Sequence, residues 1–263
     1  MHSNDRQRLQ RNIPYGTDAH QVGDLYLPGA PSPAPAVLCL LHGGFWRMPH
    51  GRAQMDAIAQ DLCARGYAVW NLGYRRVGAP GGGWPGTFED IAAGLDHLAT
   101  LVAQGVAIDL QRIAVVGHSA GGQLALCSGA RDAQRGNCAR PTRVQIAAVA
   151  ALAPVADLVQ AHDLDAGAGA VAELLGGDPQ QFRERCQDTS PIAMLPLRVR
   201  QLVMHGGADA ALPVQMSRDY VRRATAAGDA VDYIELEGAG HMAFLDPCSE
   251  AHRQLTRWLA AAL

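Results

Sequence analysis

From residue 36 onward, the chain alternates short apolar runs with longer segments that mix apolar and polar positions. Runs of the first kind are typical of buried strands, and the longer segments have the length and pattern of helices. The predicted strands are residues 36–41, 67–72, 112–116, 145–152, 201–205 and 231–237. The predicted helices are residues 53–65, 88–101, 123–131, 214–227 and 250–262. Near-continuous apolar strands separated by helices predict an α/β fold, a mostly parallel sheet with helices on both faces.

Two segments depart from this alternation. Residues 21–27 alternate apolar and polar positions and precede a proline-rich stretch at 28–35, which predicts an antiparallel edge hairpin at the start of the sheet. The connection between the strands at 145–152 and 201–205 is long and rich in Ala, Gly and Asp. Because connections of that length are usually functional, we expect a small helical cap at about 155–195, with an unstructured surface excursion as the alternative.

Length and composition favour a single domain over residues 1–263. The chain has 263 residues, of which 48% are hydrophobic, and no abrupt change of composition marks a second core. Its net charge is −3, and the 22 basic residues are scattered among 25 acidic ones, which argues against nucleic acid or a membrane surface as a partner. The polar start and the short apolar run at 146–156 predict a cytoplasmic protein without a membrane span.

The cysteines and histidines predict neither a disulfide framework nor a metal site. The six cysteines include no Cys-x-x-Cys pair, and the ten histidines show no close ligand spacing. We therefore expect free thiols, no metal and no cofactor. The cysteines are Cys39, Cys63, Cys127, Cys138, Cys186 and Cys248.

The most informative motif is the string GHSAGG at residues 117–122, between a predicted strand and a predicted helix. A Gly-x-Ser-x-Gly string alone is weak, but a strand before it and a helix after it make a sharp turn that exposes the serine. Ser119 is therefore the candidate nucleophile. The neighbouring His118 is better explained as a packing neighbour near the substrate than as a base.

A serine hydroxyl needs a base to accept its proton and an acid to orient that base. His241 follows the last predicted strand in a glycine-rich loop and is the best candidate base. Asp209 follows the preceding predicted strand and is the best candidate acid, with Asp157 as the main competitor and Asp246 as a weaker one. The chain order Ser, Asp, His is the one that accompanies this kind of turn.

The string HGGFW at residues 42–46 directly follows the predicted strand 36–41. Its glycines permit close backbone approach, so its N–H groups could meet the negative oxygen of an acyl-transfer transition state. We assign an oxyanion hole to the backbone N–H groups of Ala120 and of Gly44, Phe45 or both.

Several aromatic residues follow predicted strands at the same edge of the sheet. Trp46, Tyr74, Trp84 and His118 are candidate substrate-binding residues, suited to a flat apolar group. An equally weighted alternative makes Trp46 and Trp84 core or loop-anchoring residues. Arg75 and Arg76 could receive a carboxylate, although arginine more often pairs with a neighbouring acid.

With these motifs in order, the chain resembles the α/β-hydrolases, in the esterase-like branch whose oxyanion motif is His-Gly-Gly-Gly or His-Gly-Gly-x-Trp. Within it, HGGFW looks most like kynurenine formamidases and related carboxylesterases, although Phe45 stands where the broader pattern has a third glycine. The resemblance covers residues 22–258. It implies a nucleophile at Ser119, an acid at Asp209 and a base at His241, without a metal or organic cofactor.

The sequence thus predicts a serine hydrolase that cleaves a carboxylic ester or an aryl formamide through an acyl-enzyme. An arylformamidase is the principal alternative, and a peptidase or a non-catalytic binding protein with this fold fits less well. The expected partner is a small-molecule ester or amide. The sequence leaves the oligomeric state open, with a homodimer among the options.

Overall fold

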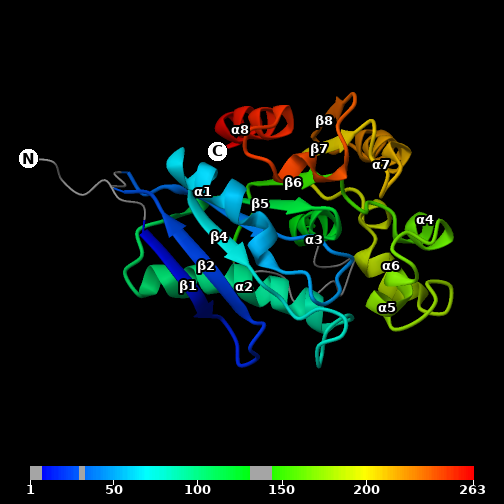
Figure 1. The fold of residues 1–263 in the computed structure, drawn as a ribbon, viewed down its shortest axis with the longest axis horizontal. Coiled ribbons are helices and arrows are strands. Elements are labelled where there is room, and N and C mark those ends of the chain that lie inside the picture. Colours follow the sequence, from blue (N-terminus) through cyan, green and yellow to red (C-terminus); the bar gives the residue numbers. More distant parts are fainter. Residues whose placement is uncertain (1–7, 30–32, 131–143) are drawn as a thin grey trace, which may run out of the picture.

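The computed structural model describes residues 8–29, 33–130 and 144–263, which are arranged around one eight-stranded sheet (Figure 1). Strands run in the order β1-β2-β4-β3-β5-β6-β7-β8 across the sheet. From β4 to β8 all neighbours pair in parallel, whereas β2 pairs antiparallel with both β1 and β4. The strands are β1 (Arg8–Pro14), β2 (Val22–Leu27), β3 (Ala36–Leu41), β4 (Ala68–Leu72), β5 (Asp109–His118), β6 (Ala148–Leu152), β7 (Arg200–Gly206) and β8 (Val231–Leu236). The predicted α/β fold with a mostly parallel sheet is confirmed.

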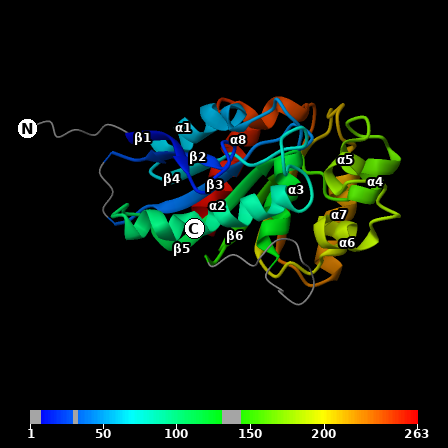
Figure 2. The ribbon, with the colours of Figure 1, turned by 90° about the horizontal axis from the view of Figure 1, so that it is seen from below.

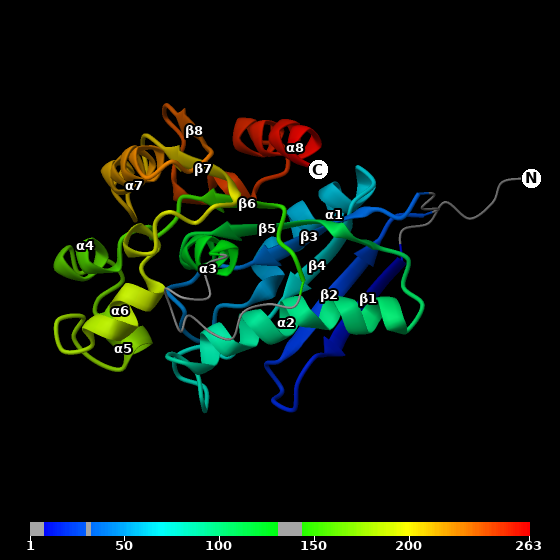
Figure 3. The same ribbon diagram turned by 180° about the vertical axis from the view of Figure 1, so that it is seen from behind.

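Helices cover both faces of this sheet (Figures 1 and 3). Apolar side chains of α1 and α8 pack on one face, and those of α2, α3 and α7 pack on the other. The helices are α1 (Asp56–Ala64), α2 (Gly86–Ala103), α3 (Ala120–Gly129), α4 (Leu158–Asp163), α5 (Ala170–Leu175), α6 (Arg183–Thr189), α7 (Val214–Ala226) and α8 (Glu250–Ala262). The 3₁₀ turns are Arg52–Met55, Pro191–Ala193 and His241–Leu245.

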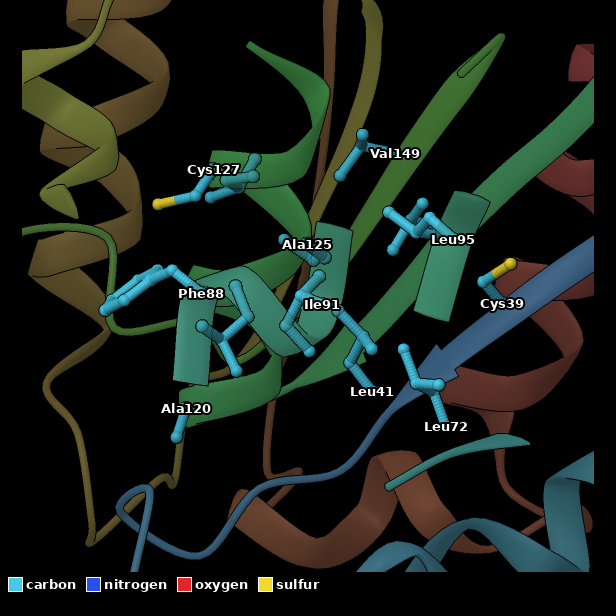
Figure 4. Packing of buried hydrophobic residues seen from close by; sticks show 14 of the residues in the cluster. Cys39, Leu41, Leu72, Phe88, Ile91, Leu95, Ala120, Ala125, Cys127 and Val149 are labelled. Carbon is cyan, nitrogen blue, oxygen red and sulfur yellow. The ribbon is translucent and has the colours of Figure 1, made fainter. Parts of the chain in front are cut away.

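The strands are apolar at almost every position because both of their faces are buried. On β3, Cys39 and Leu41 point into the layer beneath α2 and α3, while Leu38 and Leu40 point into the layer beneath α1 and α8. Figure 4 shows the first of these layers, where Leu41 and Leu72 lie close to Ile91 and Leu95 of α2. Burial of two side-chain sets per strand is the main source of stability in such a sheet.

The start of the sheet adds a strand that the sequence did not predict. All but the first of residues 21–27 form β2 in an antiparallel hairpin, as expected, but its hairpin partner is β1, which precedes it and occupies the edge of the sheet. Most of β1 is polar and exposed, so it carries no hydrophobic alternation. The hairpin turn therefore lies before β2, and the proline-rich stretch leads on to β3.

Between β6 and β7 the chain forms α4, α5, α6 and a 3₁₀ turn, which Figure 2 shows gathered at one end of the molecule beside α7. We call residues 158–193 the inserted segment. Elsewhere the predicted helix at 123–131 begins earlier, at Ala120, and its last position lies outside the described residues.

The cysteines of the described ranges, Cys39, Cys63, Cys127, Cys186 and Cys248, are all free, and only Cys248 among them is exposed. Cys138 lies outside those ranges. Over the same ranges, no helix combines the length and apolar character needed to cross a membrane. Nor do His, Cys, Asp and Glu side chains there gather in groups of three that could hold a metal ion.

A buried ion pair ties the loop after β4 to α2. The Asp90 carboxylate is fully buried and accepts hydrogen bonds from the Arg75 backbone N–H at 2.8 Å and from Arg75 Nη2 at 2.6 Å. Gln21 Nε2, just before β2, donates to the same carboxylate at 2.7 Å. Arg75 therefore pairs with an acid of the protein itself, which favours this structural role over the binding of a substrate carboxylate.

Replacing Asp90 with Ala should lower the free energy of unfolding by about 3–5 kcal/mol, because it removes the buried counter-charge of the Arg75 guanidinium and leaves only the exposed Glu89 carboxylate at 4.0 Å. The matched control is Glu235→Ala, which breaks the solvent-exposed ion pair with Arg218 and should cost at most about 1 kcal/mol. Urea unfolding of the three proteins measures both values. Equal losses in the two variants would contradict the stabilising role of the Arg75–Asp90 pair.

Candidate active site

Ser119 lies in the turn between β5 and α3, with backbone angles φ 57° and ψ −119°. A residue with a side chain rarely adopts a positive φ, so the surrounding backbone must enforce this conformation. The glycines on either side allow that packing: a Cβ on Gly117 would lie 1.9 Å from the Gly121 carbonyl oxygen, and one on Gly121 would lie 2.1 Å from the Leu41 carbonyl oxygen. The strand, turn and helix expected from GHSAGG are thus present.

Asp209 follows β7 and has a fully buried carboxylate. Its Oδ1 accepts the backbone N–H groups of Ala211 at 2.8 Å and Leu212 at 2.9 Å, and its Oδ2 lies 2.7 Å from His241 Nδ1. Burial raises the pKa of Asp209, but hydrogen bonds from His205, His241 and the Leu212 N–H outweigh it and hold that pKa well below its usual range. The carboxylate is therefore ionised and presents one oxygen to His241.

His241 begins the 3₁₀ turn after β8 and lies against the residue that precedes Ser119. The rings of His241 and His118 are 4.7 Å apart between centroids, and His118 Nε2 donates to the His241 carbonyl oxygen at 2.9 Å. Burial lowers the pKa of His118 to about 4, and the nearby His241 adds to the shift. His118 is thus a neutral ring that connects the Ser119 turn to the His241 loop.

His118 is 2% exposed, and its Nε2 bonds to the backbone of His241. Both observations support its description as a packing neighbour, whereas contact of His118 with substrate stays a prediction.

The two competitors for the acid have other partners. Asp157 caps the N-terminus of α4, where its Oδ1 accepts the backbone N–H groups of Val159 and Gln160. Asp246 is exposed and accepts the Cys248 N–H in a local turn. Of the three aspartates, only Asp209 has a hydrogen bond to His241 in the described part of the chain.

The chain after β3 forms a tight turn beside Ser119. Gly44, Phe45 and Trp46 have φ angles of 103°, 53° and 56°, and Arg47 N donates to the Gly44 carbonyl oxygen to close the turn. A Cβ on Gly43 would lie 3.1 Å from Ser119 Cβ, so this backbone packs directly on the serine. Within the described ranges, the N–H groups of Gly44, Phe45 and Ala120 donate no hydrogen bond. They are free to bind an anion.

Two of the aromatic residues expected at the site are core residues instead. Trp46 is 1% exposed and its Nε1 donates to Gln123 Oε1 at 2.9 Å. Tyr74 is fully buried, stacks on His42 and donates its hydroxyl to the His42 carbonyl oxygen at 2.9 Å. Both rings support the turn at residues 43–47, which we call the oxyanion turn after its predicted role, from within the protein. These contacts favour the alternative of core residues, and contact of either ring with substrate stays a prediction.

Phe45 and Trp84 remain partly exposed, and both contact the inserted segment. Trp84 N donates to the Leu174 carbonyl oxygen at 2.7 Å. The Phe45 ring lies against Gly167, where an added Cβ would come within 2.3 Å of the ring. These contacts place the inserted segment against the turn that follows β3.

Arg47, which the sequence did not single out, fastens that contact. Its Nε donates to Glu173 Oε2 at 2.6 Å, and its Nη atoms donate to the carbonyl oxygens of Gly167 at 2.5 Å and Ala168 at 2.7 Å. The only sequence signal was its position directly after HGGFW, because its partners lie far along the chain.

Comparison with known proteins finds two sequence relatives with named activities. Esterase LipC from Mycobacterium tuberculosis is 29% identical over 248 residues, which cover 88% of this chain and 59% of that protein. A probable isoprenylcysteine alpha-carbonyl methylesterase, ICMEL1 from Arabidopsis thaliana, is 28% identical over 46% of this chain and 24% of its own length. This chain therefore spans less than two thirds of either relative.

Solved structures share the fold over nearly the whole chain. A truncated carbohydrate esterase from gut microbiota superposes with a TM-score of 0.84 at 21% identity, covering 99% of this chain and 98% of that one. Esterase B from Lactobacillus rhamnosis superposes with a TM-score of 0.80 at 21% identity, covering 97% and 86%. This likeness shows the fold, and the predicted α/β-hydrolase architecture is confirmed.

The BD-FAE family matches residues 23–223, a range that begins in β2 and ends in α7. It contains the oxyanion turn, the Ser119 elbow, the inserted segment and Asp209, whereas His241 follows it. The chain therefore belongs to the BD-FAE family, with an α/β-hydrolase fold.

Proposed function

We propose that this protein is a serine hydrolase that cleaves small carboxylic esters through an acyl-enzyme. The observation that carries the proposal is the 2.7 Å hydrogen bond between Asp209 and His241, next to the strained turn of Ser119. The two sequence relatives described above are named as an esterase and as a probable methylesterase, and these names support ester bonds as the target.

His241 acts as the base in this mechanism. Because its Nδ1–H is bonded to Asp209, its Nε2 is the nitrogen that accepts a proton, and the adjacent carboxylate stabilises the imidazolium that forms. Ser119 Oγ transfers its proton to Nε2 as it bonds to the substrate carbonyl carbon. His241 then returns the proton to the departing alkoxide, which leaves as an alcohol.

The second half repeats these steps with water. His241 takes a proton from water, the resulting hydroxide adds to the acyl carbon, and the C–O bond to Ser119 breaks. Ser119 recovers its proton from His241 and the carboxylic acid is released. In both halves the carbonyl oxygen carries negative charge, which the N–H groups of Ala120 and of Gly44 or Phe45 stabilise.

Access to this centre is governed by the inserted segment, which acts as a small cap. Its contacts with Phe45, Arg47 and Trp84 support that role, and the two partly exposed aromatic rings are the residues to bind an apolar substrate group. With Trp46 and Tyr74 in the core, an extended aromatic wall for an aryl amine is absent from the described residues near the turn.

An aryl formamide is the second candidate substrate, favoured by the HGGFW motif and by Phe45 and Trp84. Formamide and ester hydrolysis use the same serine, base and oxyanion donors, so only the substrate profile separates them.

Ser119→Ala should reduce hydrolysis of p-nitrophenyl acetate by about 10⁴-fold or more, because the nucleophile is lost. Ser128→Ala is the matched control on α3 and should leave the rate unchanged, because among the described residues that hydroxyl bonds only to the Ala125 carbonyl oxygen. Steady-state kinetics and fluorophosphonate labelling, with circular dichroism to check folding, test both. Undiminished turnover by folded Ser119→Ala protein would refute the mechanism.

Asp209→Asn should lower kcat by about 10⁴-fold, because the amide no longer stabilises the imidazolium and can select the wrong tautomer of His241. Asp157→Asn should have little effect, since Asn caps a helix about as well as Asp. The comparison is made on one ester under saturating conditions. A larger loss in the Asp157 variant would transfer the role to that residue.

A substrate series separates ester from formamide hydrolysis. We expect phenyl acetate and phenyl butyrate to be turned over and N-formylaniline to release no aniline above the Ser119→Ala background, because both kinds of substrate present the same phenyl ring but anilide is a much poorer leaving group than phenoxide. Release of aniline at a kcat/KM equal to that for phenyl acetate would instead establish a formamidase.

A further inference from the structure

The environment of His205, at the end of β7, is not explained by the mechanism above. Its side chain is fully buried, and its Nε2 lies 3.3 Å from Asp209 Oδ2 and 3.2 Å from the Leu212 carbonyl oxygen. On its other side, Nδ1 lies 2.7 Å from the hydroxyl of Ser217, which is itself fully buried on α7. A second imidazole thus contacts the same carboxylate oxygen as His241.

These contacts determine the proton positions in the neutral ring. Both neighbours of His205 Nε2 are acceptors, so Nε2 must carry the hydrogen and donate it. Nδ1 is then an acceptor, and the hydroxyl of Ser217 is the donor that satisfies it. Ser217 therefore selects the tautomer of His205 that can donate to Asp209.

The Asp209 carboxylate is held from both of its oxygens. Oδ1 accepts the N–H groups of Ala211 and Leu212, and Oδ2 accepts that of His241 and lies 3.3 Å from His205 Nε2. Rotation of Asp209 would break these hydrogen bonds and move its charge away from the fully buried ring of His205.

The backbone around this group is also tightly packed. Gly206, the last residue of β7, has no side chain, and a Cβ there would lie 2.1 Å from the Ala239 carbonyl oxygen. Ala208 N donates to that oxygen at 3.1 Å. This hydrogen bond joins the loop that carries His241 to the loop that carries Asp209. The two backbones are therefore held together, and the side-chain orientation of Asp209 decides whether its carboxylate meets the imidazole.

We propose that Ser217 and His205 form a positioning pair that holds the Asp209 carboxylate in the orientation required to bind His241 Nδ1. This inference rests on the proposed function, and it assigns to two buried residues the task of aligning the acid with the base. Neither residue touches the substrate. Their effect belongs to the chemical step, so their loss lowers kcat and leaves KM nearly unchanged.

The test uses three substitutions in the full chain. His205→Asn removes the imidazole N–H that faces Asp209 and should lower kcat about 10–100-fold, the range typical when the hydrogen-bond partner that orients a metal ligand is removed. Ser217→Ala leaves the ring without its tautomer-selecting donor and should lower kcat about tenfold, within the same range. His205→Gln places an amide N–H near the position of Nε2 and should recover most of the activity lost in His205→Asn.

His252→Asn is the matched control for damage to a buried histidine. The His252 side chain is also fully buried and its Nε2 lies 2.6 Å from Asp61 Oδ2, but that contact joins α8 to α1. This variant should lose stability without losing kcat per fluorophosphonate-labelled site. A proton NMR resonance of the His241 Nδ1–H should broaden or disappear in His205→Asn and persist in His252→Asn.

Two results separate the failure of this inference from the failure of the proposed function. If the wild-type protein turns over esters and His205→Asn retains its kcat or changes only KM, the positioning pair is refuted while the serine mechanism stands. If neither wild type nor His252→Asn hydrolyses esters or is labelled, the proposed function fails. The Nδ1–H resonance then still tests the pair, because an unchanged resonance in His205→Asn refutes it.

Discussion

The constraint on which the structure depends is the close backbone contact where β5 turns into α3 against the end of β3. Backbone carbonyl oxygens of neighbouring residues lie so close to Gly117 and Gly121 that neither position has room for a Cβ, and Gly43 packs on the Cβ of Ser119. This contact holds Ser119 at a positive φ and places it beside the N–H groups of Gly44 and Phe45, which donate no hydrogen bond within the described residues. A side chain at these glycines would separate Ser119 from those donors, which the proposed mechanism requires.

Parallel strand order brings the remaining groups to the same edge. Because β5, β6, β7 and β8 pair in parallel, the loops that follow β5, β7 and β8 leave the sheet on one side. Ser119, Asp209 and His241 occupy these loops, and His118 and Asp209 contact His241 directly. Hydrogen bonds from Ala211, Leu212 and His118 support them in the structure without a ligand, so this geometry is established before a substrate arrives.

The aromatic residues show where local pattern and tertiary environment diverge. Trp46, Tyr74 and Trp84 all follow strands at this edge, and position alone gave no means to distinguish an exposed ring from a buried one. Gln123 on α3 binds the indole of Trp46, and His42 stacks on Tyr74, so both rings are internal. Their partners lie on other elements, and such pairings are decided by packing rather than by local sequence.

The sequence by itself determined strands β2 to β8, helices α1, α2, α3, α7 and α8, and the Ser119 turn, because apolar periodicity and paired glycines are local signals that fold the same way in most contexts. It also indicated the order of Ser119, Asp209 and His241. It ranked Asp209 above Asp157 as well, and the hydrogen bond from Asp209 to His241 supports that ranking. Only the tertiary structure showed that His118 is buried and revealed the contacts of Arg47 and His205. Each of those outcomes depends on hydrogen bonds or packing between side chains and backbone groups brought together by folding, which no periodicity along the chain records.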